Sequence, residues 1–112
     1  MKIDYENQLI VTFNFNSGVK IQKYDSINKE VLRHLRNPTG CQETLSIDVS
    51  PSMNILVVNS ENVVAVWNYE SLKYEGYFKR PNACFGIVKI LEPLPIVAVT
   101  SQSELEVDLF LV

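Results

Sequence analysis

The chain has 112 residues, a formal net charge of −3 and a hydrophobic content of 46%. Its length suits one compact domain, and its apolar fraction is that of a globular chain rather than a disordered one. The acidic balance argues against a nucleic-acid partner, because proteins that bind nucleic acid usually concentrate Lys and Arg to neutralise phosphates. The longest apolar run, residues 63–67, is far shorter than the roughly 20 residues that span a bilayer, so a membrane partner is not expected.

Two features of the sequence favour a cytoplasmic location. The first residues lack the apolar core of a secretory signal. The two cysteines, Cys41 and Cys84, are too few for a disulfide framework. We therefore expect a protein of a reducing compartment.

Short runs rich in β-branched and aromatic residues follow one another along the chain, whereas no window of eleven or more residues has helical spacing. In chain order, the strongest strand predictions are residues 9–14, 20–24, 45–49, 55–59, 63–68, 86–91, 96–100 and 105–111, and the weaker ones are 2–5, 31–35 and 74–78. Asn, Ser, Gly and Pro separate these runs in tight turns. The sequence therefore predicts an all-β fold of antiparallel meanders.

Aromatic residues that end predicted strands recur at one spacing, and so do a pair of prolines and a pair of cysteines. The spacing is 43 residues, from 67 − 24 and from 110 − 67. The repeated positions are Tyr24, Trp67 and Phe110; Pro38 and Pro81; and Cys41 and Cys84. Residues 9–11 match 55–57 at a slightly longer spacing, so turn lengths differ between units. A period of this length with four strands per unit lies in the range of propeller blades.

Several residues carry a resemblance to WD repeats. Trp67-Asn68 stands where that family has its Trp-Asp pair at the end of a third strand, and residues 47–51 resemble its first strand and Ser-Pro turn. Gly40-Cys41 lies about where a Gly-His pair precedes that strand. The chain thus resembles the WD-repeat β-propeller family over residues 1–112. The resemblance implies an incomplete propeller of antiparallel four-stranded blades, with units at roughly 1–36, 37–80 and a truncated 81–112.

The polar residues that hold a WD blade together are mostly replaced. Cys41 and Cys84 lie near the place of the family's His, and Tyr24 and Phe110 replace its Trp. Because a Phe ring donates no hydrogen bond, we expect these units to be held by apolar packing instead of the family's polar network. Cys41 and Cys84 are then small buried apolar groups, with a redox role as the alternative if they lie close together.

Motifs for chemistry are sparse, so we expect no enzyme, metal or cofactor. The single histidine, His34, is in no nucleophile motif, and the cysteines do not have zinc-site spacing. Glu104, Glu106 and Asp108 alternate along one predicted strand. We expect that stripe to face solvent, with its apolar neighbours Leu105, Val107 and Leu109 turned inward; an acidic stripe that binds a basic partner or a cation is the alternative.

The resemblance implies a scaffold that binds other proteins or peptides, with the loops at residues 37–43 and 82–85 as candidate surfaces. The apolar residues 107–112 would leave an exposed strand edge, so self-association is a further possibility. One alternative is a module that binds phosphoinositides through Lys79 and Arg80. Another is a small independent β-domain that binds a ligand.

Overall fold

The computed structural model describes residues 1–14, 18–23, 31–35, 44–60, 63–79, 86–100 and 107–112. These residues form eleven β-strands and no helix, which confirms the predicted all-β class. The strands are β1 (Lys2–Asp4), β2 (Leu9–Asn14), β3 (Gly18–Lys23), β4 (Val31–Leu35), β5 (Thr44–Ser50), β6 (Ile55–Ser60), β7 (Val63–Asn68), β8 (Tyr74–Lys79), β9 (Val88–Ile90), β10 (Ile96–Thr100) and β11 (Val107–Leu111). None of the described residues belongs to a helix that is long and apolar enough to cross a membrane.

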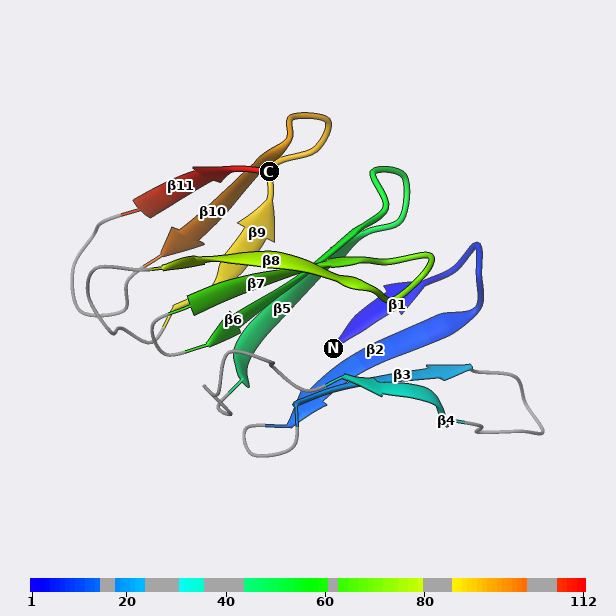
Figure 1. Ribbon diagram of the computed structural model, residues 1–112. Coiled ribbons are helices and arrows are strands. Elements are labelled where there is room, and N and C mark those ends of the chain that lie inside the picture. The colour runs from blue at the N-terminus through cyan, green and yellow to red at the C-terminus, as the bar shows by residue number, and fades with distance from the viewer. Residues whose placement is uncertain (15–17, 24–30, 36–43, 61–62, 80–85, 101–106) are drawn as a thin grey trace.

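The described strands form three antiparallel sheets, and each sheet uses one continuous stretch of the chain (Figure 1). The first sheet has the order β1-β2-β3-β4, the middle sheet has the order β5-β6-β7-β8, and the third sheet has the order β11-β10-β9. The sheets are stacked face to face, with the middle sheet between the other two. In this order each sheet is a meander, because strands that follow one another in the chain pair side by side and antiparallel.

Two apolar clusters fill the spaces between the sheets. The cluster between the first and middle sheets contains Val11, Val19, Ile21, Leu35, Ile47, Leu56, Val58, Ala65, Trp67 and Tyr69. The cluster between the middle and third sheets contains Val57, Val64, Val66, Val88, Ile90, Val97 and Val99. Alternate residues of β6 and β7 enter different clusters, because successive side chains point to opposite faces of a sheet. This explains why these two strands are continuously apolar, as expected for strands covered on both sides.

The first turn has the same construction in the first and middle sheets. In each, the side chain that ends the first strand accepts a hydrogen bond from the N–H three residues further on: Asn7 donates to Asp4 at 3.2 Å and Met53 to Ser50 at 3.4 Å. The residue before the second strand has a positive φ in both sheets, 56° in the first and 60° in the middle. Leu91 occupies the corresponding place in the third sheet, where its N–H bonds across to the second strand at 2.9 Å.

The residues two positions before Asp4, Ser50 and Leu91 are equivalent in the three sheets. Each of them begins a row of residues that pair across neighbouring strands. The rows are Lys2, Val11 and Ile21 in the first sheet; Asp48, Val57 and Val66 in the middle sheet; and Lys89, Ala98 and Leu109 in the third sheet. In the first two sheets these rows face the next sheet along the chain, because their apolar members lie in the first and second clusters respectively. The third row faces away from the stack.

The ladders also locate the repeated aromatic residues. Trp67 pairs with Leu56 and Phe110 pairs with Val97, and both aromatic rings lie against a cluster between two sheets. In the first sheet the corresponding residue of the third strand is Gln22, which pairs with Ile10. Tyr24, Pro38, Cys41, Pro81 and Cys84 lie outside the described residues, so the repeat at those positions stays a prediction.

Candidate interaction surface

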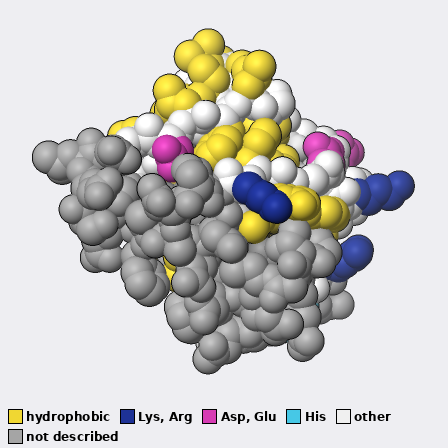
Figure 2. Space-filling model, turned by 60° about the vertical axis from the view of Figure 1, so that its left-hand side comes forward, with side chains coloured by type: hydrophobic (Ala, Val, Ile, Leu, Met, Phe, Trp, Pro, Cys, Tyr) yellow, Lys and Arg dark blue, Asp and Glu magenta, His cyan; other side chains and the backbone are white. Residues whose placement is uncertain are grey.

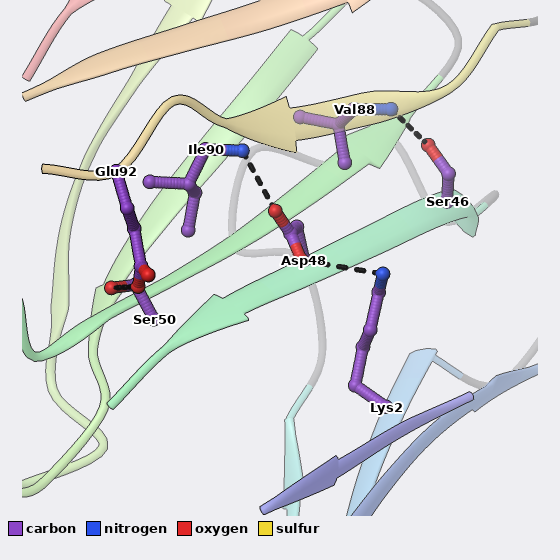
Figure 3. Close-up of polar contacts among 7 residues, drawn as sticks. All are labelled: Lys2, Ser46, Asp48, Ser50, Val88, Ile90 and Glu92. Carbon is purple, nitrogen blue, oxygen red and sulfur yellow. Dashed lines mark hydrogen bonds and ion pairs between the residues drawn. The ribbon is translucent and has the colours of Figure 1, made fainter. Parts of the chain in front are cut away.

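A polar seam joins the inner strands of the middle and third sheets (Figure 3). Ser46 Oγ accepts a hydrogen bond from the Val88 N–H at 3.1 Å, and Asp48 Oδ2 accepts one from the Ile90 N–H at 2.7 Å. Ser50 donates to the carboxylate of Glu92. The three β5 residues are two positions apart, so their side chains share one face of the strand. Ser46 and Asp48 thus accept hydrogen bonds from the β9 N–H groups that a neighbouring strand would otherwise bind.

Asp48 also ties the first sheet to the seam. The Nζ of Lys2 on β1 lies 3.4 Å from Asp48 Oδ1, while Oδ2 holds the third sheet. Asp48 is only 4% exposed, so these two partners replace the water contacts that its side chain loses on folding. Polar contacts thus accompany the apolar packing between the sheets, and the sequence-based predictions did not include them. Hydroxyl and carboxylate groups at 46, 48 and 50, alternating with apolar residues at 45, 47 and 49, were the signal for the seam in the sequence.

A second polar contact joins the first and middle sheets near their turns. The Tyr69 hydroxyl donates to Asp4 Oδ2 at 2.7 Å, and the Asn7 side-chain amide donates to the same oxygen at 2.8 Å. Burial by itself raises the pKa of Asp4, but the hydrogen bonds from Asn7 and Tyr69 outweigh it, and the pKa is below its ordinary value. Burial and the bond to Asp4 together raise the pKa of Tyr69.

Because the pKa of Asp4 is lowered in the folded state, the stability of the protein depends on pH. The contribution of Asp4 is complete above the ordinary carboxyl pKa of about 4 and is lost as pH falls through the folded value. We expect Asp4→Asn to be less stable than the wild type at neutral pH and to approach it below about pH 4. Urea unfolding at a series of pH values measures this difference, and an equal gap at every pH would exclude the role of the charge.

The outward side of the third sheet is an apolar surface, here called the open face. It consists of Ile87, Lys89, Leu91, Ile96, Ala98, Thr100, Val107, Leu109 and Leu111. Val107, Leu109 and Leu111 are 55%, 62% and 72% exposed, and Ile87 is 69% exposed. Figure 2 turns the left-hand side of Figure 1, where the third sheet lies, towards the viewer and shows hydrophobic side chains gathered at its top and centre. These side chains contribute apolar area that water covers in the isolated chain.

The orientation of β11 is opposite to the one expected. Val107 and Leu109 point outward, whereas Asp108 and Phe110 are half-buried on the inner side. The Phe110 ring stacks on Phe78 of β8, with 5.0 Å between ring centroids, and packs against the second cluster. Burial of the larger aromatic ring fixes which face of the strand turns inward. Glu104, Leu105 and Glu106 lie outside the described residues.

The two ends of the stack differ in character. The outward side of the first sheet carries the polar side chains of Thr12, Lys20, Gln22 and His34 together with Ile3 and Ile10, and these alternate with the buried residues of the first cluster. Lys89 is the one charged member of the open face, and Thr100 is its one neutral polar member. The third sheet therefore exposes more aliphatic side chains on its outward side than the first sheet does.

The outer edge of β11 is also unprotected. β3 and β7 are each paired on their outer side by a further strand, β4 and β8, whereas no described strand pairs with the outer side of β11. Lys79 and Glu75 lie on the edge strand β8, and Arg33 and His34 on β4. Such charged side chains discourage further strand pairing. The outward side chains of β11 are all aliphatic, so its edge and face both favour association.

The structure gathers no chemical site among the residues that it describes. His34 is exposed on β4, and no group of three or more His, Cys, Asp or Glu side chains in the described ranges could hold a metal ion. Lys79 is exposed at the end of β8, and Arg80, the second residue of the suggested lipid motif, lies outside these ranges. The candidate loops 37–43 and 82–85 lie outside them as well. The sequence matches no protein-family model and no curated protein.

Proposed function

We propose that this protein is a non-catalytic interaction scaffold of propeller-type blades and that the open face is its docking surface. The observation that carries the proposal is the exposure of three aliphatic side chains in a row on β11, Val107, Leu109 and Leu111. Soluble proteins rarely leave contiguous apolar patches uncovered unless the patch is a site of interaction. The partner that we propose is another protein.

Burial of these side chains would supply a useful part of the binding energy. Complete burial of a valine or leucine side chain is worth about 1.5–3 kcal/mol relative to leaving it in water. The side chains lie on a strand, which holds them in one plane before any partner arrives. Binding therefore costs little ordering of the protein itself.

The test compares the wild-type chain with Leu109→Glu as baits in an extract of the cells that make the protein. A carboxylate in the centre of the open face should weaken capture of the partner at least about tenfold, because the charge would have to be buried. Leu109 is 62% exposed, so the unfolding free energy should change by less than about 0.5 kcal/mol. Tyr77→Glu is the matched control, because Tyr77 is a 47% exposed side chain on β8 of the middle sheet.

Sedimentation of the purified wild type identifies the kind of partner. A concentration-dependent dimer that Leu109→Glu disperses would show that the surface binds a second copy of the chain. A monomer whose capture of another protein depends on Leu109 supports the proposal as stated. Equal capture by the wild type and Leu109→Glu contradicts it.

A further inference from the structure

The open face has the same arrangement of side chains as the inner face of the first sheet. In the first sheet, Lys2 lies beside the valines and isoleucine at positions 11, 19 and 21, with Leu9 at the next level. In the third sheet, Lys89 lies beside Ala98, Val107 and Leu109, with Ile96 at the level of Leu9. Each face thus combines one lysine on the inner strand with aliphatic side chains on the next two strands, and Leu91 of the open face stands where the first face has Asp4. The two faces differ in that the middle sheet covers the first face, whereas no described strand covers the open face.

The middle sheet, which packs on the inner face of the first sheet, shows which kind of partner surface binds such a face. The middle sheet packs its own aliphatic side chains against it and presents Asp48, from its inner strand, to Lys2 at 3.4 Å. Lys2 keeps part of its side chain in solvent, 42% exposed, while the carboxylate is buried. The ion pair therefore joins two residues at the same row of neighbouring sheets.

Lys89 occupies this row in the third sheet. It is exposed, and within the ranges that the structure describes its Nζ has no ion-pair partner. A sheet that docked on the open face would remove water from this ammonium group. That burial is costly unless an acceptor of opposite charge replaces the water.

We propose that the open face receives a β-sheet of another protein, and that an Asp or Glu on the inner strand of that sheet pairs with Lys89 as Asp48 pairs with Lys2. This inference rests on the proposed function, and it adds the chemistry of the partner: an aliphatic sheet face with one carboxylate. A second copy stacked in the same direction would instead present the outer side of its first sheet, where Thr12, Lys20 and Gln22 lie. The described strands of that sheet carry no carboxylate on this side, so another protein fits the proposed pairing better than a copy.

A water-soluble carbodiimide tests the contact, because it joins a lysine amine to a carboxylate only when the two groups touch. The full chain is incubated with the extract described above, treated with the carbodiimide, and digested for mass spectrometry. We expect a peptide containing Lys89 to be joined to an Asp or Glu in a strand of the partner. Lys89→Arg should keep the partner but lose this cross-link, and Leu109→Glu should lose both.

Charge reversal supplies the quantitative readout. Lys89→Glu should weaken capture at least about tenfold, because two carboxylates would face each other in the interface. Lys73→Glu, at an exposed lysine of the β7–β8 turn, should leave capture unchanged. Capture that depends on Leu109 but not on the charge at Lys89, with no cross-link from Lys89, overturns this inference and leaves the proposed function standing. Capture that is insensitive to Leu109→Glu overturns both.

Discussion

Leu56→Ala is expected to lower the free energy of unfolding by about 2–5 kcal/mol. Leu56 is 0% exposed on β6 and lies in the cluster between the first and middle sheets. The substitution therefore leaves a cavity between these two sheets. Urea unfolding followed by tryptophan fluorescence measures the loss, because Trp67 pairs with Leu56 across β6 and β7. Removing these methyl groups therefore weakens the contact between two sheets as well as the packing within one.

The control for this substitution is Leu94→Ala. Leu94 lies in the turn between β9 and β10 and is 53% exposed, so its truncation should change the unfolding free energy by less than about 0.5 kcal/mol. Equal losses for the two variants would contradict a core located between stacked sheets. A large loss for Leu56→Ala alone supports it.

Asp48→Ala is the second substitution with a large expected effect. It leaves the Ile90 N–H, now paired at 2.7 Å, without an acceptor in a buried seam, which should cost about 1–3 kcal/mol. Loss of the ion pair to Lys2 adds less, because Lys2 is 42% exposed and water screens it. The same urea titration measures the effect.

Two further variants divide the role of Asp48 into its parts. Asp48→Asn keeps an oxygen acceptor for the Ile90 N–H, so it should retain most of the stability that Asp48→Ala loses. Lys2→Met removes only the exposed partner and should cost no more than about 1 kcal/mol. If Lys2→Met were as damaging as Asp48→Ala, the hydrogen bond to β9 would not be the main contribution of the seam.

The local pattern of the sequence was sufficient to predict the strands. Each strand is short and bounded by turn residues, so runs such as residues 55–59 and 63–68 are visible within a few positions. Their continuous apolar character is typical of strands covered on both faces, and these strands are the centre of the middle sheet. The sequence therefore predicts well the features that depend on neighbouring residues, namely the positions of strands and turns.

The orientation of β11 could not be predicted in the same way. Alternation shows that Val107 and Leu109 share a face opposite Asp108 and Phe110, but both faces carry apolar residues. The choice depends on a ring contact with Phe78, which belongs to a different sheet. A contact between residues so far apart in the sequence leaves no local signal.

The partners in the polar seam could not be predicted from the sequence, because its contacts join β5 to a sheet whose residues lie 42 positions further along the chain. Ser46, Asp48 and Ser50 occupy one face of β5, and their partners are backbone N–H groups or a glutamate on the third sheet. No side-chain motif marks such backbone partners in a sequence. The open face was anticipated only in part, as an apolar end strand, because its full set of residues depends on how β9, β10 and β11 pair.

The most direct test of the open face as a docking surface measures two properties of Leu109→Glu. These are its unfolding midpoint and its affinity for the captured partner. Because Leu109 lies on the outside of the third sheet and is 62% exposed, we predict an unchanged midpoint together with binding that is at least about tenfold weaker. Unchanged binding at an unchanged midpoint would show that the open face is not the docking surface.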